Sequence, residues 1–156
     1  MLQRGFTLIE LLISLALLAI LASLAAPNFS QFIAQRSVRA TSEQLRDTMT
    51  YARQEALKRN RSIKVDISSN VVKTTVVSDS TNLQEWTAKV PVTDGTVTID
   101  GNGRGTITNT FSVTSNQFTC KASGGPLACF NVQLLSGGAA RLCDPQATTG
   151  SMEACL

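Results

Sequence analysis

The chain has no histidine among its 156 residues. This absence excludes a Ser-His-Asp triad, a Cys-His pair and a zinc site with histidine ligands. The carboxylates beyond residue 62 are scattered, and most stand near turns, where aspartate commonly bonds to the local backbone. They include Asp66, Asp79, Glu85, Asp94, Asp100 and Asp144. Since no spacing suggests a paired acid and base or a calcium loop, we expect neither an enzyme nor a bound cofactor or metal.

Charge is nearly absent from the N-terminal region. Between Phe6 and Ala26 the only ionisable side chain is that of Glu10, within a largely apolar span of 21 residues. About 20 apolar residues suffice to cross a bilayer. A carboxylate inside such a span costs about 2.5–3.5 kcal/mol on insertion scales, so it is usually kept for a partner or a function. We predict a transmembrane helix over residues 6–26 and a specific role for Glu10.

The flanks of this span predict its orientation. Arg4 lies on the short N-terminal side, and the positive-inside tendency therefore places that end in the cytoplasm. Everything after Pro27 then faces the other compartment. An ordinary secretory signal, cut near Ser23-Leu24-Ala25, is the rival interpretation. The single basic residue, the carboxylate and a span longer than the roughly 7–15 residues of a signal core argue against it. An uncut membrane anchor is the remaining alternative.

Cysteine is confined to the last 37 residues, at Cys120, Cys129, Cys143 and Cys155. An even number in an exported domain is typical of disulfides. Four cysteines allow three pairings, and we favour Cys120–Cys129 with Cys143–Cys155. These close short loops that contribute roughly 2–3 kcal/mol each in the chain-entropy model. A four-cysteine metal site is the alternative, but no Cys-x₂-Cys pair occurs.

Residues 28–60 contain no glycine or proline and keep a helical rhythm. One predicted apolar face consists of Val38, Leu45, Met49, Ala52 and Ala56. The opposite face predicts the ion pairs Arg39 with Glu43, Glu43 with Arg46, and Glu55 with Arg59. Together with the apolar span this predicts one helix of about 50 residues, roughly 75 Å long, with a kink at Pro27. Residues 27–61 form its amphipathic part.

From Ser62 the period of the apolar pattern falls to two. A hairpin is predicted from Ile63–Ile67 and Val71–Val77, with Ser68-Ser69-Asn70 as its turn. Further strands are predicted at Glu85–Val90, Thr96–Asp100, Thr106–Thr108, Thr110–Thr114, Ala128–Leu135 and Ala139–Leu142. A long helix followed only by short strands predicts an α+β fold, with the helix packed across one antiparallel sheet.

The first ten residues, Met1-Leu2-Gln3-Arg4-Gly5-Phe6-Thr7-Leu8-Ile9-Glu10, resemble the class III leader of type IV pilins and type II secretion pseudopilins. The resemblance implies that residues 1–5 are a leader, that a prepilin peptidase cuts after Gly5, and that Phe6 is then N-methylated. It also implies that Glu10 guides assembly, and it favours pairing of Glu10 with the N-terminal amine of a neighbouring subunit over pairing with the amine of its own chain. A glutamate that reaches the membrane interface is the remaining alternative.

Two later patches resemble the GspH/FimT family of minor pilins and pseudopilins. They are residues 53–60 (RQEALKRN), which lead into the hairpin, and residues 137–143 (GGAARLC). The resemblance implies the type IV pilin fold, with a β-rich periplasmic region over residues 62–156 anchored in the inner membrane by a single span. Its implied partners are other pilin subunits, the prepilin peptidase and an inner-membrane assembly platform. The subunit would later enter a pilus or pseudopilus.

We expect a minor pilin that helps to initiate or cap a type IV pilus. A minor pseudopilin of type II secretion is the alternative. A DNA-binding minor pilin for natural transformation is a third interpretation, because some relatives carry Gly-Arg-x-Arg near the C-terminus. Here Gly138-Ala139-Ala140-Arg141 keeps only the second arginine. Arg104, in a glycine-rich loop, is a second candidate DNA contact.

The basic end of the predicted helix is another candidate phosphate contact, since clustered positive charge is the footprint of nucleic-acid binding. It comprises Lys58, Arg59, Arg61 and Lys64. No aromatic residue interleaves with these four, and a solvated helix end explains them more simply.

Overall fold

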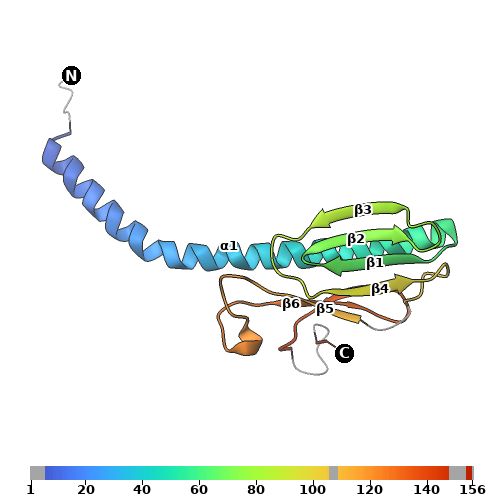
Figure 1. Ribbon diagram of the computed structural model, residues 1–156. Helices are drawn as coiled ribbons and strands as arrows, with labels where there is room; N and C mark the ends of the chain where they lie inside the picture. The colour runs from blue at the N-terminus through green and yellow to red at the C-terminus, as the bar shows by residue number, and fades with distance from the viewer. Residues whose placement is uncertain (1–5, 106–108, 148–153, 156) are drawn as a thin grey trace, which may run out of the picture. The chain divides into compact units, whose positions relative to one another are not determined.

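The structure, a computed structural model, describes residues 6–105, 109–147 and 154–155, without the side chains of residues 24–28 and 109. The chain divides into two compact units, residues 1–33 and 34–156. One long helix, α1, covers Leu8–Arg59 and so contributes to both units (Figure 1). The predicted leader, including Gly5, lies outside the described residues.

The ends of α1 have local chemical causes. The Thr7 hydroxyl accepts a hydrogen bond from the backbone N–H of Glu10 at 3.3 Å, as expected of an N-cap threonine. At the other end Asn60 adopts a left-handed conformation with φ of 50°, which stops the helix. The predicted length of about 50 residues is confirmed by the 52 residues observed.

Pro27 lies within α1, among the residues whose side chains are not described. The kink predicted there stays a prediction. Within the residues that were described, no helix is both long enough and apolar enough to cross a membrane.

The predicted α+β fold, a long helix packed on antiparallel sheet, is confirmed, and the strands of the second unit form two such sheets. The first has the order β3-β2-β1-β4, and the second the order β5-β6-β7. Their strands are β1 Ile63–Ser68, β2 Val71–Val76, β3 Asn82–Thr87, β4 Gly95–Ile99, β5 Asn109–Val113, β6 Phe130–Leu134 and β7 Ala140–Cys143. In the described part of the chain the outer edge of β4 makes an isolated bridge, Ile99 with Gly105, rather than a ladder with a further strand. The later strands therefore pair among themselves.

The predicted hairpin is confirmed, with Ile63 opposite Val76 and Ser68 opposite Val71. The strand predicted at Glu85–Val90 instead covers Asn82–Thr87 and pairs with β2 through a bulge beside Thr74 and Thr75. The other strands lie within a residue or two of their predicted ranges, except that residues 106–108 are outside those described.

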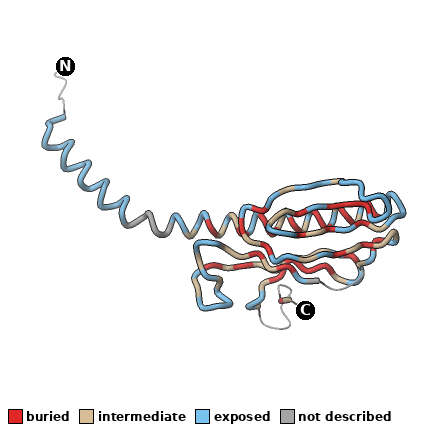
Figure 2. Tube along the Cα trace, in the orientation of Figure 1, coloured by how far each residue is buried: buried red, intermediate tan, exposed pale blue. Residues whose placement is uncertain are grey.

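The core of the second unit forms where one stripe of α1 meets the sheets (Figure 2). All five residues of the predicted apolar face are fully buried: Val38, Leu45, Met49, Ala52 and Ala56. Ile63, Val65 and Ile67 of β1 join them as alternate residues of one strand. The core therefore forms between residues that share one face of the helix and residues that share one face of the strand.

Two of the three predicted helix ion pairs occur. Arg39 Nε lies 3.0 Å from Glu43 Oε1, and Arg59 Nε lies 2.6 Å from Glu55 Oε2. The predicted pair of Glu43 with Arg46 was wrong. Arg46 instead uses Nε and Nη2 on Asp47 Oδ1, at 3.1 and 2.8 Å.

Disulfides join Cys120 to Cys129 and Cys143 to Cys155, which is the sequential pairing. The loop closed by the first disulfide is tied to α1 by a single side chain. Gln35 donates through Nε2 to the carbonyl of Ala128 at 2.7 Å and accepts from its N–H at 2.8 Å. A side-chain amide thus pairs with a backbone peptide much as a neighbouring strand would.

We expect Met49→Ala to lower the free energy of unfolding of the second unit by about 2–5 kcal/mol, because it leaves a cavity in a fully buried site. Urea unfolding followed by fluorescence of Trp86, the only tryptophan, measures this change. Gln54→Ala, on the exposed face of the same helix, is the matched control and should change stability by less than about 0.5 kcal/mol. Equal effects of the two substitutions would contradict the packing described here.

Candidate assembly surface and basic residues

The N-terminal part of α1 presents an apolar surface in every direction. Each residue from Phe6 to Ser23 is exposed, as are Phe29, Phe32 and Ile33. The large apolar side chains among them are between 48% and 82% exposed. A helix that is apolar all round is normally covered by lipid or by other protein. We call residues 6–33 the assembly segment.

Glu10 is the only ionisable residue within the assembly segment. It lies in the first turn of α1, where the helix dipole favours a negative charge. Ser14 Oγ donates to the backbone carbonyl of Glu10 at 2.8 Å. This hydrogen bond uses the backbone of Glu10 and not its carboxylate. None of the ion pairs within the described residues uses the Glu10 carboxylate. An uncompensated carboxylate on an apolar helix calls for a positive partner.

The basic residues at the end of α1 face carboxylates of the same chain. The Glu55 side chain is only 11% exposed. Its Oε2 lies 2.6 Å from Arg59 Nε, and its Oε1 lies 3.6 Å from Lys58 Nζ. The hydrogen bond from Arg59 is the main cause that holds the pKa of Glu55 below its ordinary value, and the charge of Lys58 lowers it further. Arg61 Nη1 lies 3.3 Å from Asp79 Oδ2. These ion pairs give three of the four basic residues, Lys58, Arg59 and Arg61, a structural role at the helix end.

Arg141, a candidate DNA contact, is half-buried on β7. Its Nε and Nη2 both donate to Gln133 Oε1, at 3.1 and 2.8 Å. Gln133 lies on β6 and is 1% exposed, so this pair joins two strands across the small sheet. Arg141 therefore has a structural role that the sequence did not indicate.

Arg104, the other candidate, is exposed in the turn after β4. Its N–H donates to Asp100 Oδ1 at 2.8 Å, which fixes the backbone of the turn. This turn and the turn before Arg141 meet at Arg53, whose Nε donates to the Gly103 carbonyl at 3.1 Å. A Cβ atom added at Gly138 would collide with that same Gly103 carbonyl oxygen, and Gly138 has a left-handed φ of 76°. Glycine is needed there for both reasons.

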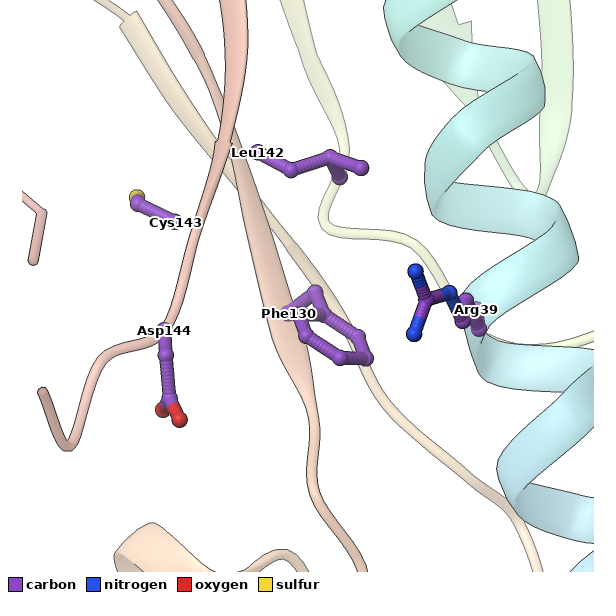
Figure 3. A pocket seen from close by; sticks show the side chains of 5 residues that line it. All are labelled: Arg39, Phe130, Leu142, Cys143 and Asp144. Atoms are coloured by element: carbon purple, nitrogen blue, oxygen red, sulfur yellow. The ribbon is translucent and has the colours of Figure 1, made fainter. Parts of the chain in front are cut away.

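A small cleft lies between α1 and the second sheet (Figure 3). It has a volume of about 170 Å³ and is lined by Arg39, Phe130, Leu142, Cys143 and Asp144. The Arg39 guanidinium points toward the ring of Phe130, whereas the Asp144 carboxylate points away from it. Cys143 is held in a disulfide, so the cleft contains no free thiol. No group of three metal-binding side chains occurs in the described portion of the chain.

Comparison with known proteins gives two family matches and a structural likeness. Residues 1–26 match the prokaryotic N-terminal methylation motif, and residues 41–153 match the type II transport protein GspH. The type IV minor pilin FimU of Pseudomonas aeruginosa has a similar fold in two crystal forms. The first is 17% identical, with a TM-score of 0.58 over 77% of this chain and 98% of that one. The second is 18% identical, with a TM-score of 0.55 over 72% and 98%.

The ion pairs of Glu55 predict a dependence of stability on pH. A carboxyl group whose folded pKa is lowered stabilises the fold above its unfolded pKa, and this contribution is lost as the pH falls through the folded value. We therefore expect Glu55→Gln to lower stability at neutral pH and to flatten the loss of stability below about pH 4.3. Urea unfolding across this range measures it.

Glu85→Gln is the matched control, because its side chain is about half exposed in its pair with Lys73. It should change the pH profile less than Glu55→Gln. Superimposable profiles for the wild-type chain and Glu55→Gln would contradict the assignment.

Proposed function

Because the chain belongs to the family of the type II transport protein GspH and carries the N-terminal methylation motif, we propose that it helps to initiate or cap a type IV pilus. It is a minor pilin or pseudopilin. The observation that carries the proposal is the assembly segment, which presents apolar side chains all round and one carboxylate. Such a helix suits a subunit that passes from lipid into a bundle of similar helices.

In this proposal residues 6–26 lie in the inner membrane before assembly, with the N-terminus in the cytoplasm and residues 62–156 in the periplasm. The two disulfides fit the oxidising periplasm. A prepilin peptidase removes residues 1–5 and exposes the amine of Phe6. An assembly platform in the same membrane then transfers the subunit to the fibre.

The proposed role of Glu10 follows from the cost of a charge in lipid. Cleavage after Gly5 creates a cation on each mature chain, and the carboxylate of Glu10 is its natural partner. Pairing Glu10 with the amine of a neighbouring subunit neutralises two charges at once. Entry into the fibre would then relieve a penalty of about 2.5–3.5 kcal/mol that the isolated span carries in the membrane. Assembly would thus be favoured over the free membrane state.

A minor pseudopilin of type II secretion is the alternative function. The matching family is described as type II transport protein GspH, whereas the two similar structures are type IV minor pilins. Co-purification with major pilin or with major pseudopilin distinguishes these machines. DNA contact through Arg104 or Arg141 stays a prediction, and the bonding of Arg141 to Gln133 adds no support to it.

We expect mass spectrometry of the mature chain to find N-methylated Phe6 as the first residue. Gly5→Leu should leave residues 1–5 in place, because we predict that the peptidase site accepts only glycine there. A mature chain that begins at Ala26, or one that begins at Met1 in the wild type, would refute the proposed processing.

We expect Glu10→Ala to remove the subunit from sheared fibres while cleavage and membrane insertion continue, because only the pairing across subunits is lost. Immunoblots of the fibre and membrane fractions measure this distribution. Ser14→Ala, one turn away on the same helix, is the control and should still enter the fibre. Normal incorporation of the Glu10→Ala chain would rule out an assembly role for this carboxylate.

A further inference from the structure

A groove of about 650 Å³ runs between α1 and β3 within the second unit. Its helix side includes Glu43, Asp47 and Tyr51, and its strand side consists of Leu83 and Gln84. Neither the proposed assembly nor the two disulfides involves it. Trp86 of β3 bonds to a residue that lines the groove, because its Nε1 donates to Thr48 Oγ1 at 3.0 Å and thereby holds β3 against the helix.

Among the residues that the structure describes, the strand beside this groove pairs with another strand at one edge only. β3 is the outermost strand of its sheet in the order β3-β2-β1-β4, and it lies along the outer margin of the sheet in Figure 1. Ala88 N–H donates to the Asn70 carbonyl at 2.8 Å, so this pair belongs to the hydrogen-bonded set. Antiparallel pairs alternate, which makes Val72–Trp86 hydrogen-bonded and Val71–Thr87 not. The backbone N–H and C=O of Thr87 therefore point away from β2.

The same alternation applies to Glu85, which is opposite Lys73. Its backbone groups also point outward, while its side chain contacts Lys73 Nζ at 3.7 Å on the sheet. The bulge beside Thr74 and Thr75 interrupts the pattern at the other end of β3. The available edge is consequently short, and it is centred on residues 85–87.

The groove is also acidic. Among the residues that line it, Glu43 and Asp47 carry charge and no lysine or arginine is present. Both carboxylates have basic neighbours on the exposed helix surface, Arg39 and Arg46, through ion pairs of the kind that contribute little in water. Such exposed pairs exchange partners readily. A positively charged side chain that enters the groove can therefore contact either carboxylate.

These observations point to one kind of occupant. We propose that the edge of β3 and the acidic groove bind an extended, basic segment of another protein subunit. A strand added to β3 would lie about 4.7–4.9 Å from it. The backbone of the added strand would bond to Glu85 and Thr87, and its alternate side chains would point toward Glu43 and Asp47. Backbone bonds supply affinity and the alternate lysines or arginines supply selectivity.

Trp86 provides a direct measurement, because it is the only tryptophan and its Nε1 bonds to Thr48, which lines the groove. The full chain in neutral detergent is titrated with the peptide Lys-Thr-Lys-Thr-Lys-Thr and, separately, with Glu-Thr-Glu-Thr-Glu-Thr. We expect the basic peptide to change the Trp86 emission with a saturating curve below about 1 mM. The acidic peptide should leave the emission unchanged.

Two pairs of variants test the two halves of the proposal. Glu43→Gln combined with Asp47→Asn should weaken binding of the basic peptide about three- to tenfold, whereas Glu85→Gln, on the other face of β3, should not. Thr87→Pro removes an outward N–H that an edge strand can lose without harm to its own sheet, and should weaken binding about two- to tenfold. Thr87→Val keeps that N–H and is its control.

Near-ultraviolet circular dichroism verifies that each variant is folded. The proposal is overturned if the basic peptide gives no saturating change, or if the acidic peptide binds equally well. It is also overturned if folded Thr87→Pro and the Glu43/Asp47 double variant both bind like the wild type. Each of these results is independent of whether the chain enters a fibre.

Discussion

The second unit depends on the burial of a single stripe of α1. Val38, Leu45 and Met49 have no exposed surface, and the small Ala52 and Ala56 let the strands approach the helix closely. Full burial of a side chain as large as Leu or Met contributes about 1.5–3 kcal/mol. Since the two sheets have separate strand orders, the helix and its apolar stripe provide the core they share.

Polar side chains of the same helix then place the peripheral parts of the unit. Gln35 holds the loop of the first disulfide through Ala128, Thr48 holds β3 through Trp86, and Arg53 holds the turn at Gly103. Each of these hydrogen bonds fixes the position of one segment along the length of α1. The exposed groove, the edge of β3 and the cleft beside Phe130 are consequences of these attachments. The helix therefore determines where these surface features lie as well as how the unit folds.

The sequence predicts those parts of the protein in which local periodicity determines structure. Spacings of seven, four, three and four residues identify the buried stripe of α1, and alternation identifies the hairpin of β1 and β2. The number of sheets was not predictable, because it depends on which strand edges meet after the turn at Asp100. The predicted ion pair of Arg46 with Glu43 does not form, because two nitrogens of Arg46 bond to the carboxylate of the adjacent Asp47.

The site was predictable only in its N-terminal part. Glu10 is noticeable because an apolar span contains one charge. The roles of Gln35 and Arg53 were missed because their partners lie 93 and 50 residues away, a separation that no local pattern reports. Arg141 was noticed for its spacing from Gly138, but its contact with Gln133 depends on the pairing of β6 with β7. A glutamine opposite an arginine in adjacent predicted strands would have been the only available signal.

We propose that the apolar assembly segment packs against the helices of other pilin-like subunits. A photoreactive amino acid at Leu21, which is 65% exposed, tests this claim in living cells. We expect crosslinks from Leu21 to the N-terminal helix of another pilin-like subunit in the fibre fraction, and we expect these crosslinks to be lost in the Glu10→Ala chain. Crosslinks to lipid alone, with or without Glu10, would contradict it.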